Sequence, residues 1–178
     1  MNLIKSYYQL CKPNVVYMML ICAFVGMLLA EDSVSSFSKI CIALFGIALC
    51  SGSAAAINQV IDRKADAAMT RTDQRPLPQG ELSAFHASCF AFVIGVLGAL
   101  ILYFFVNTLT MVLTLASLIG YAFIYTVYLK RATPQNIVIG GLAGAAPPLL
   151  GWASISNSID PYAPVSYTHL TLPTILLV

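Results

Sequence analysis

The stretch ICIALFGIALCSGSAAAINQVIDRKAD, residues 40–66, begins as an apolar run and ends in charged side chains. From Ile40 to Ile61 it is long enough for a helix to cross the hydrocarbon core of a membrane, which takes about 20 residues. Asn58, Asp62 and Asp66 are spaced by four, so a helix that continues past Ile61 carries them along one face. The stretch therefore predicts a membrane helix whose end presents a ladder of oxygen atoms about 12 Å long.

The composition of the whole chain agrees with a membrane protein. Of its 178 residues 59% are hydrophobic and only 9% are charged, and the mean hydropathy is +0.84. Soluble domains are about a quarter charged. The net charge of +2 is small and the basic residues are interspersed with acids, which argues against a nucleic-acid partner. We expect the lipid bilayer to be the main partner.

Five apolar runs predict an all-α, multi-pass transmembrane helix bundle. The first and the last run are short, so their limits are the least certain. Turn residues and charges separate the runs, including the break at Asn107 and Thr108. The runs lie near residues 15–30, 40–61, 84–106, 109–129 and 136–153.

The distribution of Lys and Arg predicts the orientation in the membrane, because cytoplasmic loops carry an excess of these residues. A cytoplasmic N-terminus leaves Lys39 alone on the outer side. No Arg-rich, Ser-rich presequence precedes Lys5, which favours a bacterial inner membrane over an organelle. The residues then on the cytoplasmic side are Lys5, Lys12, Arg63, Lys64, Arg71, Arg75, Lys130 and Arg131.

Two features have simple interpretations. The first apolar run could be a signal peptide, with Leu28 to Ala30 as a cleavage site, but four further runs follow it. The five cysteines show no metal-ligand or C-x-x-C spacing, and we expect them to pack as small hydrophobic residues.

The charged end of the stretch suggests chemistry. Carboxylate and amide oxygens suit Mg²⁺, which one or two carboxylates usually hold while water and substrate phosphates fill the other positions. Arg71 and Arg75 follow, and guanidinium groups match phosphate oxygens. These residue types together predict a metal that bridges the acids to a diphosphate. The alternative is a solvated helix end in which Asp62, Arg63 and neighbouring charges pair locally.

The motif resembles a known family. Asn58-Gln-Val-Ile-Asp62-Arg-Lys-Ala-Asp66, with Arg71-Thr72 and Arg75-Pro-Leu-Pro78 after it, is similar to the first aspartate-rich motif of the UbiA-type intramembrane prenyltransferases. In that superfamily such residues bind an isoprenyl diphosphate through Mg²⁺. Within it, Gln59 and the segment from Lys130 to Trp152 resemble the protohaem IX farnesyltransferases, or haem O synthases.

The resemblance implies an activity. A farnesyl group passes from farnesyl diphosphate to a vinyl group of haem b, water adds, and haem O forms for terminal oxidases. Mg²⁺ is the implied cofactor, and an oxidase-assembly or haem-pathway protein is an implied partner. The implied catalytic residues are Asp62, Asp66, Arg71 and Arg75, the implied metal ligands are Asn58, Asp62 and Asp66, and the implied substrate-binding residues are Asn58, Arg71, Arg75, Tyr125, Lys130 and Arg131.

Three further features keep two interpretations each. Tyr121, Tyr125 and Tyr128 recur at helical spacing and face either the farnesyl chain or the membrane interface, where Tyr is enriched. His86 is a ligand of haem iron or an ordinary interfacial histidine. Pro147-Pro148 interrupts the last run beside a substrate cavity or at a packed kink.

The chain departs from the resembled family in its length. Family members have about nine spans and a second acidic motif, whereas this chain carries only the first half of that pattern. We expect residues 1–153 to form the N-terminal half of the membrane domain and residues 154–178 to be an extramembrane segment with an unrelated tail. Three other functions remain open: a quinone-pathway prenyltransferase, a channel or transporter fragment, and a structural membrane subunit.

Overall fold

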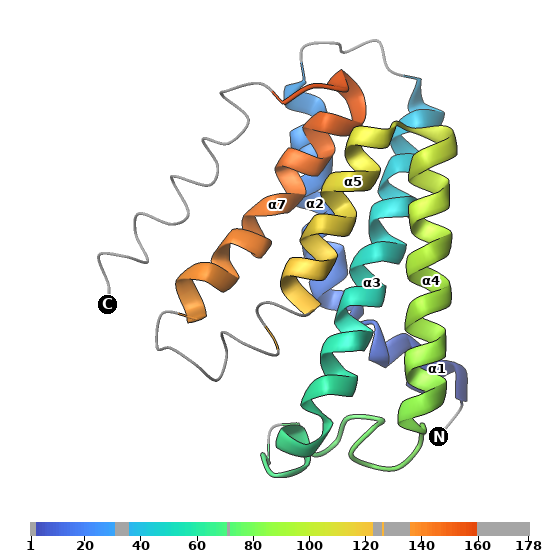
Figure 1. Cartoon of the computed structure of the whole chain (residues 1–178), viewed down its shortest axis with the longest axis vertical. Coiled ribbons are helices and arrows are strands. Elements are labelled where there is room, and N and C mark those ends of the chain that lie inside the picture. The colour runs from blue at the N-terminus through green and yellow to red at the C-terminus, as the bar shows by residue number, and fades with distance from the viewer. Residues whose placement is uncertain (1–2, 31–35, 71, 123–125, 127–135, 160–178) are drawn as a thin grey trace.

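The computed structural model of the chain is all-helical (Figure 1). It describes residues 3–30, 36–70, 72–122, 126 and 136–159, with side chains throughout except at 136–144. All five apolar runs contain a helix. The helices are α1 (Leu3–Leu10), α2 (Pro13–Leu29), α3 (Phe37–Ala67), α4 (Ala84–Phe105), α5 (Thr108–Ile119) and α7 (Asn136–Ser156).

Helices α3 and α4 run side by side along most of their length (Figure 1). Small residues hold them close: a Cβ atom added at Gly98 would lie 2.8 Å from the Cys50 sulfur, and one at Gly95 would lie 2.7 Å from Ser53 Oγ. The Ser53 hydroxyl also donates a hydrogen bond to the Ala91 carbonyl over 2.7 Å. Because these side chains are small, the two backbones approach closely, as the dense small residues of the α3 sequence predicted.

Helices α2 and α7 make the other close pair. Gly26 of α2 faces the carbonyl of Pro148, and Gly151 of α7 faces the carbonyl of Ala23, with no room for a Cβ atom at either glycine. Pro147 and Pro148 lie inside α7 rather than at its end. Pro148 thus lies directly against α2, while Ala146 and Leu150, on either side of the two prolines, line an apolar cavity, so the packing and cavity interpretations both stay open.

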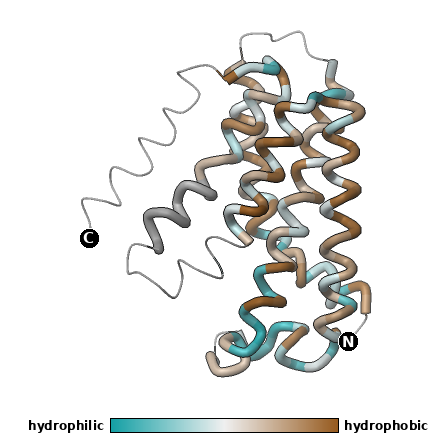
Figure 2. Tube along the Cα trace, in the orientation of Figure 1, coloured by the Kyte–Doolittle hydropathy of each residue, from teal (hydrophilic) through white to brown (hydrophobic). Residues whose placement is uncertain are grey.

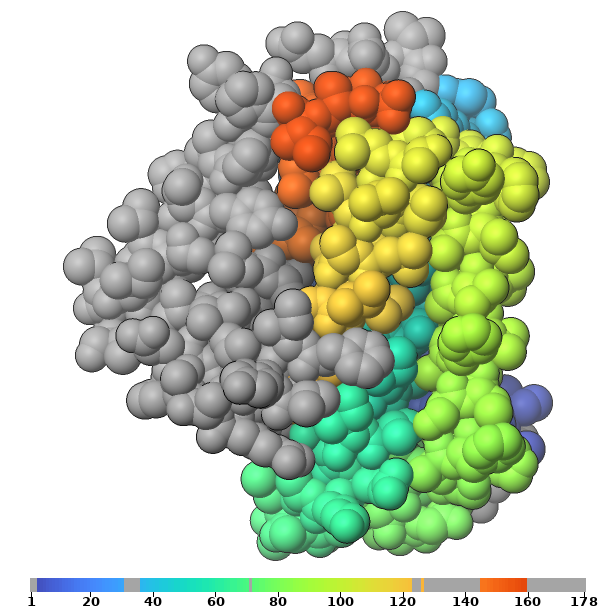
Figure 3. Space-filling model, viewed as in Figure 1, coloured from blue at the N-terminus to red at the C-terminus, as the bar shows by residue number. Residues whose placement is uncertain are grey.

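The outer surface of the bundle is apolar. Large side chains on α4 are widely exposed, with Phe92 and Phe104 each 70% accessible. The face in Figure 3 shows α4 and α5 next to each other, and in Figure 2 the polar residues gather at the lower end of α3 and in the loop that follows. An apolar belt with polar residues at one end is what a lipid environment requires. The protein is a membrane protein.

The structure confirms the all-helical architecture but not the number of five membrane spans. Among the described residues, α3 and α4 are each long and apolar enough to cross a bilayer. Helices α1 and α2, bent by 47° at the break between them, would make a third span if they act as one. Helix α5 is shorter, and the end of the predicted fourth run lies largely outside the described residues.

The break predicted at Asn107 is where α5 begins. The Asn107 side chain accepts a hydrogen bond from the backbone amide of Thr110 over 2.7 Å and donates one to the Ala153 carbonyl over 2.9 Å. One residue thus caps α5 and ties it to α7. This contact closes the end of the bundle away from the charged motif.

Candidate functional site

The ladder of oxygen-bearing side chains lies on the buried face of α3. Helix α3 continues without interruption to Ala67, so Asn58, Asp62 and Asp66 share one face. These three residues are only 5%, 4% and 5% exposed. Arg63 and Lys64, on the opposite side, are exposed. The two acids are therefore not part of a solvated helix end, which was the alternative interpretation of this stretch. Charged groups are buried at such cost that they are normally paired.

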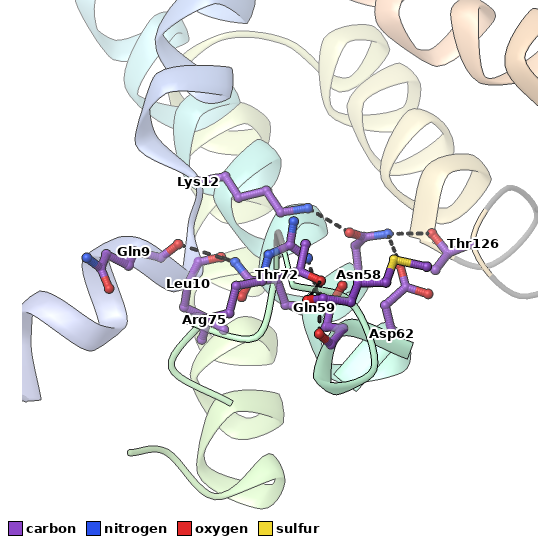
Figure 4. Close-up of polar contacts among 11 residues, drawn as sticks. Gln9, Leu10, Lys12, Asn58, Gln59, Asp62, Thr72, Arg75 and Thr126 are labelled. Carbon is purple, nitrogen blue, oxygen red and sulfur yellow. Dashed lines mark hydrogen bonds and ion pairs between the residues drawn. The ribbon is translucent and has the colours of Figure 1, made fainter. Parts of the chain in front are cut away.

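Asn58 is held from two sides (Figure 4). The Lys12 ammonium donates a hydrogen bond to Asn58 Oδ1 over 2.7 Å. The amide nitrogen Nδ2 of Asn58 donates to Thr126 Oγ1 over 3.0 Å and to Asp62 Oδ2 over 3.3 Å. The Thr126 hydroxyl in turn donates to the Tyr121 carbonyl over 2.8 Å. Three segments of the chain, namely the corner before α2, α3 itself and the turn after α5, thus fix the orientation of this one amide.

Asp66 is paired with Arg75. The Arg75 nitrogen Nη1 lies 2.5 Å from Asp66 Oδ2, and the Arg75 side chain keeps 28% of its surface exposed. The loop between them turns back because the Thr72 hydroxyl donates to the Asp66 carbonyl over 2.9 Å. A buried hydroxyl in the loop after α3 therefore helps to place the guanidinium beside the ladder.

Gln59 holds the corner between α1 and α2 against α3. Its nitrogen Nε2 donates to the Gln9 carbonyl over 3.2 Å and to the Leu10 carbonyl over 3.0 Å. Lys12 follows at this corner in a left-handed conformation, with φ 50° and ψ 63°. A left-handed lysine is uncommon and persists only where the surroundings enforce it. Here the corner directs the Lys12 side chain at Asn58.

An apolar cavity of about 200 Å³ opens beside the ladder. Ser51, Ala54 and Ala55 of α3 contribute to its wall on the face that carries Asn58, and their small side chains leave the space open. Lys12 lies at its polar side. The other lining residues come from α2, α3, α5, α7 and the turn after α5: Val15, Val16, Met19, Cys50, Thr114, Ser117, Leu118, Tyr121, Ala146 and Leu150.

A second pocket, of about 250 Å³, lies between the α1 corner and the loop after α3. It is lined by amides and cations, and Lys12 and Arg75 both reach it. Lys12 therefore borders both the apolar cavity and the polar pocket. The polar pocket is lined by Gln9, Lys12, Gln59, Gln74, Arg75 and Pro76.

The residue types of the ladder are those that suit a magnesium ion of the substrate-bridging kind. In the part of the chain that the structure describes, no group of three or more His, Cys, Asp or Glu side chains is placed to hold a metal. Two carboxylates and one amide suit Mg²⁺, which keeps other positions for water and phosphate oxygens. The oxygens also attract cations in the structure itself, since Lys12 and Arg75 both bind to them.

The structure brings together four of the predicted site residues, namely Asn58, Asp62, Asp66 and Arg75. His86 lies exposed in the first turn of α4, and its backbone amide is capped by Ser83. Four predicted site residues and Tyr128 lie outside the described residues. They are Arg71, Tyr125, Tyr128, Lys130 and Arg131.

Three residues of the site were not predicted as site residues: Lys12, Thr72 and Thr126. Lys12 carries a weak sequence signal, because a lone lysine before Pro13 interrupts an apolar segment. Thr126 gives no such signal, since a threonine in an apolar run is common. Its role depends on contact with a residue 68 positions away.

Comparison with known proteins shows the family of the chain. The model of the UbiA prenyltransferase family matches residues 19–178. The chain belongs to the UbiA prenyltransferase family. As a family member it is similar to the protoheme IX farnesyltransferase of Hahella chejuensis, with 57% identity over 159 residues, covering 89% of the chain and 53% of that relative. The protein of the same name from Legionella pneumophila is 54% identical over 159 residues, which are 89% of the chain and 54% of the relative.

The chain spans about half the length of these curated relatives. The family match extends past residue 153, but residues 160–178 lie outside the described structure, so the boundary expected at 153 stays a prediction.

Two solved structures share the fold of this family member. A digeranylgeranylglyceryl phosphate synthase aligns with a TM-score of 0.83 at 19% identity, over 97% of this chain and 60% of that one. A UbiA homologue from Archaeoglobus fulgidus, bound to DMAPP and Mg²⁺, aligns with a TM-score of 0.77 at 19% identity, over 96% of this chain and 62% of that one. At this identity the likeness establishes a UbiA-like helical fold.

Proposed function

We propose that the chain is part of a Mg²⁺-dependent membrane prenyltransferase that transfers a farnesyl group from farnesyl diphosphate to a vinyl group of haem b and so makes haem O. The observation that carries the proposal is the position of the Asn58, Asp62 and Asp66 ladder beside an apolar cavity, with Lys12 bordering both. The identity of 54–57% to proteins named protoheme IX farnesyltransferase supports the choice of donor and acceptor.

The two environments match the two ends of a prenyl diphosphate. The hydrocarbon chain fits the cavity between α2, α3, α5 and α7, because its lining is mostly aliphatic. The diphosphate fits the polar end, where Lys12 and Arg75 supply positive charge. A volume of about 200 Å³ holds only part of a farnesyl chain, so other residues of the complete enzyme would cover the remainder.

The reaction requires the diphosphate to leave with its electron pair. Bound Mg²⁺ would supply the charge neutralisation that makes diphosphate a leaving group. In this proposal Asn58, Asp62 and Asp66 hold the metal, and Arg75 and Lys12 contact phosphate oxygens. Donors fixed before the reaction stabilise charge as it develops, which is usually the largest catalytic effect. We propose the same phosphate- or propionate-binding role for Arg71, Lys130 and Arg131, and a place along the farnesyl chain for Tyr125.

We further propose that α2, α3, α4, α5 with the turn after it, and α7 are five membrane spans with the N-terminus in the cytoplasm of a bacterium. The Lys and Arg bias supports this orientation. The ladder then lies at the cytoplasmic face, where Mg²⁺ and water-soluble diphosphate are available.

The test is direct. The complete enzyme that contains this chain, reconstituted in lipid nanodiscs, is incubated with Mg²⁺, farnesyl diphosphate and either haem b or a phenolic quinone precursor, and the products are identified by mass. Haem O with the first acceptor is the expected product, and it should disappear when EDTA is added. A farnesylated phenol would overturn the proposed acceptor. Absence of Mg²⁺-dependent binding of farnesyl diphosphate would overturn the proposed site.

A further inference from the structure

We propose that Lys12 and Arg75 are internal counter-ions of the ladder, which occupy the metal-binding oxygens until a diphosphate draws them away, so that the divalent metal and the diphosphate enter together. The proposal rests on the metal and diphosphate site of the proposed function, but it requires neither haem nor a completed reaction. It concerns the order and the coupling of binding.

The geometry gives each end of the ladder its own cation. The Lys12 ammonium lies 2.7 Å from Asn58 Oδ1, and Arg75 Nη1 lies 2.5 Å from Asp66 Oδ2. Both acceptors belong to residues that are 5% exposed. A metal that coordinates these two oxygens must replace a charge-assisted hydrogen bond at each of them, and such bonds are about twice as strong as neutral ones.

The charges of the cluster also favour joint binding of the metal and the diphosphate. Asp62 and Asp66 carry two negative charges, and Lys12 and Arg75 carry two positive ones. Among the described residues, these four side chains therefore sum to zero net charge before any ligand binds. A divalent cation alone would leave the cluster strongly positive, with two displaced cations nearby, and like charges in a buried site repel strongly. A diphosphate brings several negative charges and so restores the balance.

The displaced side chains have a place to go. Lys12 borders both the apolar cavity and the polar pocket, and Arg75 borders the polar pocket. Each can turn from a ladder oxygen to a phosphate oxygen at the same mouth without leaving the site. Because guanidinium and ammonium groups bind phosphate well, diphosphate makes the displacement of both cations favourable.

This exchange is a thermodynamic coupling. If the diphosphate strengthens metal binding by some factor, the metal strengthens diphosphate binding by the same factor. The counter-ions increase this factor, because they oppose the metal when it is alone and hold the diphosphate when both are bound. If Lys12 had only a structural role at the corner, replacing it would lower the affinity for both ligands or for neither.

The experiment measures Mn²⁺ binding by the EPR signal of the free ion, with and without inorganic diphosphate, to the whole chain in nanodiscs. The variant Lys12→Gln removes one counter-ion. We expect it to bind Mn²⁺ alone roughly tenfold more tightly, the fold-change that corresponds to one charge-assisted hydrogen bond, and to bind diphosphate more weakly in the presence of Mn²⁺. The coupling factor falls accordingly.

Three variants serve as controls. Lys64→Gln removes one positive charge from an exposed position of α3, and Lys12→Arg keeps the charge at the corner. Lys64→Gln should behave as the parent chain, Lys12→Arg should reverse much of the change seen in Lys12→Gln, and Asp62→Asn should bind Mn²⁺ more weakly in either condition. Melting curves identify any variant that fails to fold, and Arg75→Gln then provides the same test at the other end of the ladder.

Each outcome is decisive. Opposite shifts in Lys12→Gln, tighter for Mn²⁺ alone and weaker for diphosphate, support the counter-ion role. An unchanged or weaker Mn²⁺ affinity overturns it, as does an equal gain in Lys64→Gln, which would reflect general electrostatics. Because the measurement uses no haem, a chain that fails to make haem O can still pass it, and the two proposals fail separately.

Discussion

The Lys12 ammonium donates a 2.7 Å hydrogen bond to Asn58 Oδ1, although 46 positions separate the two residues. The contact joins the corner between α1 and α2 to the ladder on α3. It depends on the left-handed backbone of Lys12 and on Gln59, which holds the same corner. Site geometry and fold stability therefore share these few residues, and the predictions below separate their contributions.

Replacing Asp62 by Asn should abolish most Mg²⁺-dependent binding of farnesyl diphosphate. The substitution removes one of two buried carboxylates while keeping its shape, so we expect at least about a tenfold loss of affinity. Isothermal titration with and without EDTA measures it. Asp73→Asn is the matched control, since Asp73 lies in the loop beyond the ladder. Equal losses in both variants would contradict a specific role for Asp62.

Replacing Gln59 by Leu should lower the stability of the bundle by about 1–3 kcal/mol, because the carbonyls of Gln9 and Leu10 lose their shared buried donor. Unfolding in graded SDS measures the change. Gln79→Leu removes a similar bond, to the Asp73 carbonyl, at an exposed site. That control should change stability by less than about 0.5 kcal/mol, and the reverse ranking would show that Gln59 does not hold the corner.

Replacing Thr126 by Val should weaken diphosphate binding several-fold, because the Asn58 amide loses an acceptor that fixes its orientation. The same titration detects this loss. Thr108→Val, at an exposed position at the start of α5, should leave the affinity as it is. An unchanged affinity in Thr126→Val would mean that Lys12 and Asp62 orient Asn58 without help.

Replacing Gly151 by Ala should destabilise the pair of α2 and α7 by about 1–3 kcal/mol, since the new methyl group would meet the backbone carbonyl of Ala23. Gly120→Ala provides the contrast: among the described residues no atom lies within 4 Å of an added Cβ there, and the backbone is right-handed helical. That change should stabilise by about 0.4–1 kcal/mol. Similar melting shifts for both variants would argue against close packing at Gly151.

Much of the site could be predicted from the sequence because it depends on local periodicity. The spacing of Asn58, Asp62 and Asp66 determines that they share a face once the segment is helical, and the apolar run before them makes it helical. The breaks at Asn107 and after Ala67 are also local, since they arise from capping residues and loss of hydrophobicity.

Only the tertiary structure decided which cations meet these oxygens. Arg75 was expected to bind phosphate, yet it pairs with Asp66, and Lys12 and Thr126 reach Asn58 from segments 46 and 68 positions away. Such contacts depend on the angle of a single corner and on how closely small residues let helices approach. Sequence periodicity specifies the face of one helix, whereas the partner of that face follows from the packing of all the helices together.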